Sequence, residues 1–145
     1  MYLLESVYGT EIIQLFQEKL VSNLNHHEYE WSRENIQGMK ASVDFLCEFG
    51  QLILNKGVIH GKRLFSEEYY QQMVTAYSPG GFPECSRYGL SWWINQEEEP
   101  FIRACGFGGQ MLAIHPAKKM VISIFSDMDR SHPENIQILF DAFCM

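Results

Sequence analysis

The sequence predicts an α+β fold in which helices flank an antiparallel β-sheet. Residues 1–79 are expected to be mainly helical, because three segments there carry apolar residues at three-to-four spacing. Residues 84–130 are expected to form antiparallel strands, because short aromatic and β-branched runs alternate with turn residues. Ser131 and Glu134 form a capping box, which predicts a closing helix over residues 131–145. The 145 residues therefore fit one domain with helices packed against a sheet.

The first amphipathic helix is predicted near the start of the chain, with Thr10 as its cap. Its apolar stripe recurs at three-to-four spacing: Ile13, Phe16, Leu20 and Leu24. His26, His27 and Glu28 are interpreted as a polar loop, because adjacent side chains point in different directions and no third metal ligand follows at useful spacing. The polar residues 28–37 are interpreted as a connection across the surface.

Two further helices are predicted from their capping residues. Ser42 can cap the second, which would end at Asn55-Lys56-Gly57. Gly50 lies inside this helix, where glycine costs about 1 kcal/mol relative to alanine, so close packing against a neighbouring element is expected. Residues 58–64 are interpreted as a short loop, and Ser66 can cap the third helix.

The strand half follows the clearest break in the sequence, residues 78–83, which are rich in turn residues. Residues 88–95 are predicted to be a single strand because of their aromatic and branched side chains. Three more strand-like runs follow: Phe101-Ile102, Met111 to Ile114 and Met120 to Phe125. Successive short strands of this kind predict an antiparallel meander.

Composition and charge argue against several classes of function. The net charge of −7 disfavours a nucleic-acid partner. No apolar run reaches the roughly 20 residues that span a bilayer, and residues 1–9 lack the features of a signal peptide, so a cytoplasmic location is expected. The four cysteines lack metal-type spacing and are interpreted as reduced thiols rather than disulfides. Neither a metal nor a cofactor is predicted.

A glycine-rich stretch, Ala104 to Gln110, lies between two of the predicted strands. Three glycines in four residues keep side chains away, so backbone N–H groups can approach a ligand closely. The stretch is not a dinucleotide fingerprint, because Met111 stands where the third glycine would be. It is not a P-loop either, because it contains no Gly-Lys-Ser/Thr. We interpret it as the wall of a binding site.

Several stretches occur in an order that is typical of one family. They are residues 41–55 (ASVDFLCEFGQLILN), Gly57, residues 61–68 (GKRLFSEE), residues 88–93 (YGLSWW) and residues 106–110 (GFGGQ). In this order they resemble the serine β-lactamase and penicillin-binding-protein superfamily, in the class C-like branch that includes esterases and D-alanyl-D-alanine peptidases. The resemblance implies a β-lactamase/transpeptidase-like fold. It also implies a small-molecule acyl substrate (a β-lactam, a peptide or an ester) hydrolysed through an acyl-serine.

Two motifs of that family, Ser-x-x-Lys with the nucleophile and Tyr-x-Asn/Ser, do not occur in the sequence. Both would lie before Met1, so the chain is expected to be the C-terminal part of such a hydrolase, truncated at its N-terminal side. It would then hold no catalytic serine, lysine or tyrosine of its own, and we expect it to be inactive alone. The parent protein could be exported, as members of the family often are.

The third family motif, Lys/His-Thr/Ser-Gly, aligns with Ala104-Cys105-Gly106, which lacks the cation and the hydroxyl. The resemblance implies a substrate-binding role for these three residues and for Phe107 and Gly108. The backbone N–H of Phe107 would be one oxyanion-hole donor, and the other would come from the absent serine. One donor cannot make the hole, and the loss of one donor can cost about 100-fold to 1000-fold in rate.

Two alternatives stay open. The chain could be a non-catalytic binding or self-associating module, because without covering segments apolar surface would be exposed near Trp92, Ile102 and Leu112. Cys105 could instead act as a nucleophile, which would need a nearby base, and His115 is the nearest in sequence. A structural role for Cys105 is favoured over this, because an apolar strand separates the two residues.

Overall fold

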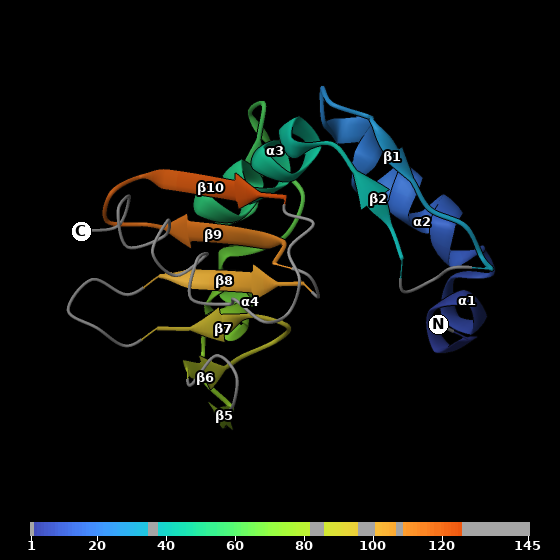
Figure 1. Cartoon of the computed structure of the whole chain (residues 1–145). Coiled ribbons are helices and arrows are strands. Elements are labelled where there is room, and N and C mark those ends of the chain that lie inside the picture. The colour runs from blue at the N-terminus through green and yellow to red at the C-terminus, as the bar shows by residue number, and fades with distance from the viewer. Residues whose placement is uncertain (1, 35–37, 82–85, 96–100, 107–108, 126–145) are drawn as a thin grey trace.

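The computed structural model describes residues 2–34, 38–81, 86–95, 101–106 and 109–125. Its largest element is a six-stranded antiparallel sheet with the order β10-β9-β8-β7-β6-β5 (Figure 1). Each strand pairs with its neighbours in the chain, so the sheet is a meander. The strands are β5 (Ser78–Gly81), β6 (Ser86–Tyr88), β7 (Trp93–Ile94), β8 (Ile102–Cys105), β9 (Met111–His115) and β10 (Met120–Ile124). The predicted α+β fold, an antiparallel sheet with helices against it, is confirmed.

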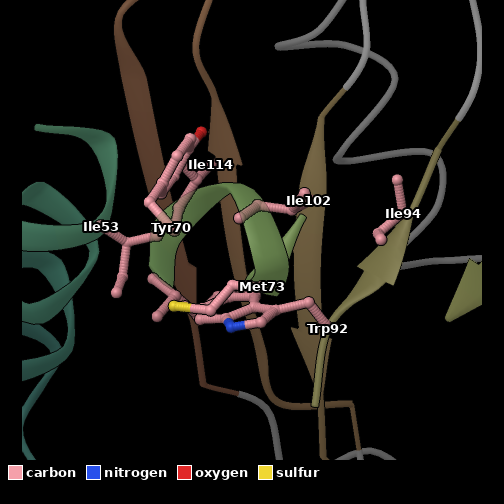
Figure 2. Packing of buried hydrophobic residues seen from close by; sticks show 8 residues of the cluster. Ile53, Tyr70, Met73, Trp92, Ile94, Ile102 and Ile114 are labelled. Carbon is pink, nitrogen blue, oxygen red and sulfur yellow. The ribbon is translucent and has the colours of Figure 1, made fainter. Parts of the chain in front are cut away.

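Two helices, α3 (Val43–Leu54) and α4 (Glu67–Met73), pack on one face of this sheet. The buried cluster between them and the strands is seen in Figure 2 and contains Ile53, Tyr70, Met73, Trp92, Ile94, Ile102, Leu112 and Ile114. At Gly50 of α3 an added Cβ would overlap Val121 Cγ1 and would lie 3.0 Å from Leu112 Cδ1. The close packing that the sequence predicts at this glycine is confirmed.

The opposite face of the sheet carries a smaller cluster, in which Phe101, Met111 and Ala113 are buried. Side chains alternate between the two faces of a strand, so β9 contributes to both clusters. All five of its residues are buried. This double burial explains why the strand is almost continuously apolar in sequence.

Residues 2–34 and 38–41 form an arm beside the sheet (Figure 1). The arm contains α1 (Tyr2–Tyr8), α2 (Ile12–Lys19), the 3-10 turn η1 (Val21–Asn23) and the paired strands β1 (Tyr29–Glu30) and β2 (Lys40–Ala41). A second cluster of buried residues joins the arm to α3 and to the segment that follows it: Val21, Leu24, Phe45, Leu52 and Ile59. The ring of Phe16 packs edge-on against Tyr29 at 5.5 Å between centroids.

The predicted starts of the second and third helices are confirmed, as is the predicted end of the second. Ser42 Oγ accepts a hydrogen bond from Phe45 N–H at 3.0 Å, and Ser66 Oγ accepts one from Tyr69 N–H at 3.0 Å. These bonds satisfy backbone donors that have no partner inside a helix. α3 ends at the predicted place, where Lys56 and Gly57 take φ values of 52° and 91°.

The helix predicted to begin after Thr10 starts and ends at different residues from those predicted. Glu11 is the residue that precedes α2, and the Thr10 hydroxyl donates to Tyr8 O at 3.4 Å instead of capping the helix. α2 ends at Lys19, so Leu20 and Leu24 flank η1 rather than continuing the helix. Both leucines still pack in the cluster against α3. The apolar spacing therefore predicts burial, although the backbone changes from an α-helix to a 3-10 turn.

Two predicted connections contain short strand pairs. Residues 58–64 are not a plain loop, because β3 (Val58–Ile59) and β4 (Lys62–Arg63) pair around His60-Gly61. The φ values of 48° and 77° at these two turn residues are those that a two-residue hairpin requires. Residues 28–37 include β1, which pairs with β2. Strands of two residues are too short to show a periodic pattern in sequence.

Two predictions in the strand half are corrected. The break at residues 78–83 includes β5, which forms the edge of the sheet and carries a register shift. Residues 88–95 are two strands rather than one, because the chain turns between Tyr88 and Trp93. Gly89 N–H donates to Trp92 O at 2.8 Å, and Ser91 has a φ of 66°. A Cβ on Gly89 would lie 2.5 Å from Met73 O, so the turn passes directly over the end of α4.

The predicted closing helix, residues 131–145, lies outside the described residues. The division of the chain into a helical part, a strand part and a closing helix stays a prediction. Within the described ranges, no helix is long and apolar enough to cross a membrane.

Candidate functional site

The glycine-rich stretch of the sequence is the turn between β8 and β9. Cys105 pairs with Met111, and Gly106 N–H then donates to Gln110 O at 2.8 Å. Gly109 N–H donates to Gly106 O at 3.3 Å, and Gly109 has a φ of 92°. A glycine with a positive φ at the end of a hairpin turn is common. The stretch is therefore a tight hairpin at one end of the sheet.

Gly106 is a glycine because the two ends of the hairpin approach each other closely. A Cβ at this position would lie 3.1 Å from Gln110 Oε1 and 3.2 Å from Gln110 Cβ, which is tighter than ordinary contact. The N–H and the carbonyl of Gly106 both form hydrogen bonds within the hairpin. Its N–H is thus engaged in the turn, and an oxyanion donor would have to come from another residue. Phe107, the predicted donor, and Gly108 lie outside the described residues.

The other two predicted site residues are placed on opposite faces of β8. The side chain of Ala104 packs against the cluster that α3 and α4 form with the sheet. Cys105 packs on the other face, beside the cluster of Phe101, Met111 and Ala113. Alternation along a strand produces this separation. Ala104 and Cys105 therefore do not present their side chains to one common site.

His115 is not positioned to be a base for Cys105. In the register of the sheet Cys105 pairs with Met111, whereas His115 pairs with Met120. The four residue steps from Met111 to His115 correspond to about 13 Å along the strand. The imidazole of His115 is 3% exposed and lies parallel to the ring of Phe101, with 6.1 Å between the centroids. His115 Nδ1 also accepts a hydrogen bond from Lys118 N–H at 3.4 Å. The separation of the two residues along the strand supports the structural interpretation of Cys105.

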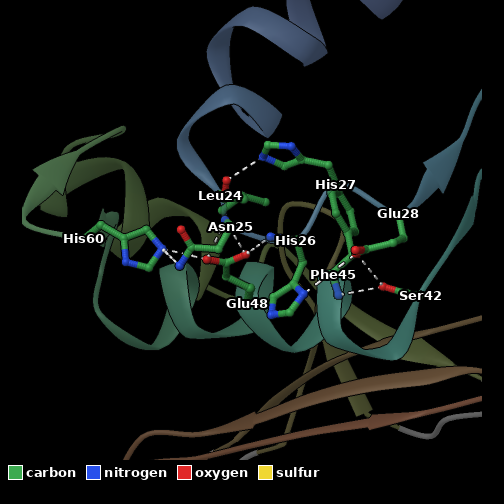
Figure 3. A network of polar contacts seen from close by, with 9 residues as sticks. All are labelled: Leu24, Asn25, His26, His27, Glu28, Ser42, Phe45, Glu48 and His60. Carbon is green, nitrogen blue, oxygen red and sulfur yellow. Dashed lines mark hydrogen bonds and ion pairs between the residues drawn. The ribbon is translucent and has the colours of Figure 1, made fainter.

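A cluster of polar contacts around Glu48 connects three segments (Figure 3). The Glu48 carboxylate accepts hydrogen bonds from the backbone N–H of Asn25 at 2.8 Å and of His26 at 2.8 Å. It also lies 2.6 Å from His60 Nε2, on the turn between β3 and β4. The Glu48 side chain is only 8% exposed. One carboxylate in α3 thus contacts both the arm, between η1 and β1, and the β3–β4 hairpin.

The pKa of Glu48 reflects these contacts. Burial is the largest influence and raises the pKa, but the N–H groups of His26 and Asn25 and the imidazole of His60 lower it. The net result is a pKa below the ordinary value of 4.5. The described residues contain no group of three or more His, Cys, Asp or Glu side chains placed to hold a metal ion. Because the carboxylate bonds to the backbone of the arm and to the β3–β4 turn, we assign a structural role to this cluster.

A surface hollow on the arm was missed by the sequence analysis. It has a volume of about 520 Å³ and is lined by Tyr29, Glu30, Trp31, Ser32, Gly38 and Lys40. The Lys40 ammonium lies 3.2 Å from the Glu30 carboxylate, so these two charges compensate each other. The ring of Phe16 supports Trp31 edge-on at 5.2 Å. A lone tryptophan in a polar segment was the one signal of this hollow in the sequence.

The predicted exposed surface of the sheet is corrected by the structure. Trp92, Ile102 and Leu112 are 5%, 4% and 5% exposed, because they lie in the cluster beneath α3 and α4. The sequence could not show this, since the covering helices precede these strands by tens of residues. Large exposed apolar side chains occur on α1, at Leu3, Leu4, Val7 and Tyr8. Others lie next to strands of the sheet, at Tyr77, Leu90 and Phe125.

Comparison with known proteins gives one line of support for the fold. No protein-family model matches the chain. Among solved structures, it is similar to a Bacillus anthracis protein named "Putative 6-aminohexanoate-dimer hydrolase", with a TM-score of 0.80 and 23% sequence identity. The match covers 99% of this chain and 40% of that chain. The chain thus spans about two fifths of the length of this relative and shares the fold of the corresponding part of a β-lactamase-fold hydrolase.

Proposed function

We propose that the chain is part of a β-lactamase-related serine hydrolase and that it has no acyl-transfer activity by itself. The observation that carries the proposal is the structural match over 99% of the chain to a hydrolase of this fold. The ordered motifs of the sequence, from residues 41–55 to residues 106–110, support the same assignment. In this proposal the hairpin between β8 and β9 contributes one wall of an acyl-binding site.

The expected lack of activity has a chemical reason. Acyl transfer through a serine needs a nucleophile with a base in hydrogen-bond reach, and family members use Ser-x-x-Lys with a tyrosine for this. No serine of the sequence has a lysine three positions later, and no tyrosine has Asn or Ser two positions later. The Gly106 N–H is engaged with Gln110. Phe107 would be left as a single oxyanion donor, which does not complete an oxyanion hole.

The substrate class of the whole enzyme is part of the proposal. The family resemblance suggests a β-lactam, a peptide or an ester, and the name of the structural relative refers to a dimer of 6-aminohexanoate, which is a linear amide. All four are acyl compounds that a serine can attack at a carbonyl carbon. One fold supports several such substrate specificities.

An activity test separates this proposal from an independent enzyme. The purified chain would be incubated with a fluorophosphonate probe, a fluorescent penicillin and the 6-aminohexanoate dimer, and the Bacillus anthracis relative would be assayed in parallel. We expect neither covalent labelling nor amide hydrolysis above that of heat-denatured chain. Labelling that requires the folded chain, or release of 6-aminohexanoate by it, would contradict the proposed inactivity and would point to a different nucleophile.

A further inference from the structure

The face of the sheet that points away from α3 and α4 is buried. On this face Phe101, Met111 and Ala113 are 6%, 3% and 2% exposed. Arg103 and His115 share it, because alternate residues of a strand point to the same side, and they are 7% and 3% exposed. A single sheet cannot bury its own face, so side chains this inaccessible require a second layer packed on them.

The elements described above do not supply this layer. Helices α3 and α4 pack on the other face of the sheet, and the arm joins α3 through the cluster that contains Val21 and Phe45. The cluster on the buried face consists of strand residues and the adjacent Phe101; besides the three buried side chains it includes Cys105, Ile122 and Ile124. Within the described ranges no helix contributes to it. The second layer therefore comes from the remaining residues of the chain.

Residues 126–145 are the one remaining stretch long enough to form a layer. The other stretches outside the described ranges are short: residue 1 and residues 35–37, 82–85, 96–100 and 107–108. Residues 126–145 follow closely after β10, which is the last strand of the sheet on that side. A helix of ten residues is about 15 Å long, whereas β8 and β10 lie about 10 Å apart, so such a helix can cross all three strands.

The sequence of this stretch fits the buried face. The capping box of Ser131 and Glu134 predicts a helix, and its apolar residues recur at three-to-four spacing: Ile136, Leu139, Phe140 and Phe143. At 3.6 residues per turn these four positions cover about 100° of the helix surface. No charged residue falls within this stripe, whereas Asp141 lies on the opposite side of the helix. A helix of a globular protein turns such a stripe toward a core.

We propose that residues 131–145 form the second layer on this face, as a helix whose apolar stripe packs against Phe101, Met111 and Ala113. The sheet then has a helical layer on each side, α3 and α4 on one and the closing helix on the other. The chain completes the core on this side with its own residues, without a partner. The inference rests on the burial of the sheet face and does not depend on the hydrolase assignment.

Thiol labelling of the purified chain tests the proposal with two matched variants. Ile136→Asp places a carboxylate in the stripe, whereas Ile138→Asp makes the same change about 200° further around the helix. The measurement is the rate at which iodoacetamide modifies Cys105, which packs on the buried face, as followed by mass spectrometry of its peptide. Cys47 is the internal reference, because it lies in α3, which packs on the opposite face.

Ile136→Asp should speed the modification of Cys105 by at least about tenfold, because a carboxylate in the apolar contact loosens the layer. Ile138→Asp should stay within about twofold of the wild type, and neither change should alter the rate at Cys47. An unchanged rate at Cys105 in Ile136→Asp would overturn the proposal. Equal acceleration by both variants would also overturn it, because that is the result for a strand, in which residues 136 and 138 share one face.

A milder pair of variants covers the case in which Ile136→Asp unfolds the chain, which would speed the modification of Cys47 and Cys105 together. Ile136→Ala and Ile138→Ala then decide, because loss of an apolar side chain is less disruptive than burial of a charge. Ile136→Ala should speed the modification of Cys105 more than Ile138→Ala does, with Cys47 unchanged. Equal rates at Cys105 in the two alanine variants would overturn the proposal.

Discussion

In strand β9 all five residues from Met111 to His115 are buried, whereas in helix α1 the apolar residues Leu3, Leu4, Val7 and Tyr8 are exposed. The strand lies between β8 and β10 and has apolar clusters on both of its faces. The helix lies at the end of the arm away from the sheet (Figure 1). Similar apolar composition thus leads to opposite burial. An apolar pattern shows that a face needs covering, and the surrounding fold determines whether it is covered.

The largest difference between the two regions is expected in the free energy of unfolding, when one apolar side chain in each is replaced by alanine. Ile114 is 0% exposed, so Ile114→Ala should lower the free energy of unfolding by about 3–5 kcal/mol through lost burial and a residual cavity. Leu3 is 76% exposed, so Leu3→Ala should change it by less than about 0.5 kcal/mol. Urea denaturation at low protein concentration measures both values. If both substitutions lowered the free energy of unfolding equally, Leu3 of α1 would have to be buried in the monomer.

The next largest effect is expected where α3 contacts the sheet. Gly50→Ala should lower the free energy of unfolding by about 2–3 kcal/mol despite the better helix propensity of alanine, because the new methyl group overlaps Val121. Gln51→Ala, at the adjacent exposed position of α3, serves as the control and should be close to neutral. In the background of Val121→Ala the cost of Gly50→Ala should fall. Additive costs would argue against contact between these two positions.

A smaller effect is expected at the contact between the arm and α3. Glu48→Gln should lower the free energy of unfolding by about 1–2 kcal/mol, because a neutral amide accepts the N–H groups of Asn25 and His26 less strongly than a carboxylate does. Hydrogen exchange of the backbone amides of Asn25 and His26 should accelerate. Unchanged exchange at these amides would contradict the assigned role of the carboxylate.

The same carboxylate predicts a pH dependence. The pKa of Glu48 in the folded chain lies below its ordinary value of 4.5, so the folded state favours the ionised form. Its contribution to stability is present above pH 4.5 and is lost as the pH falls through that value toward the folded-state pKa. The difference in free energy of unfolding between wild type and Glu48→Gln should therefore shrink in acid. If the difference in free energy of unfolding between the two proteins grew below pH 4.5, the pKa of Glu48 would be raised by folding and not lowered.

The smallest effect is expected at the helix caps. Ser42→Ala removes the acceptor for Phe45 N–H, and Ser66→Ala removes the acceptor for Tyr69 N–H, each at a cost of about 1 kcal/mol. Ser42 also donates to a Glu28 oxygen at 3.4 Å, which links the start of α3 to the arm. A slightly larger cost for Ser42→Ala, seen as a lower thermal midpoint, would support a contribution from the arm contact.

The sequence by itself determined the features whose physics is local. The caps at Ser42 and Ser66 depend on an N–H three residues away, and the end of α3 at Gly57 depends on the freedom of one glycine. The antiparallel meander also followed from short runs separated by turns, because each strand pairs with its neighbour in the chain. The ordered motifs predicted the fold that the structural comparison supports.

Only the tertiary structure decided which surfaces are covered and which side chains share a site. Trp92 and Leu112 are buried because α3 and α4 lie over them, and the sequence of the strands does not contain that information. Ala104 and Cys105 are neighbours in the chain but face opposite sides of β8. The exposure of α1 arises from the anchoring of Glu5 by Arg33, 28 residues away. Burial depends on segments distant in sequence, so a local pattern can indicate a face but cannot identify what covers it.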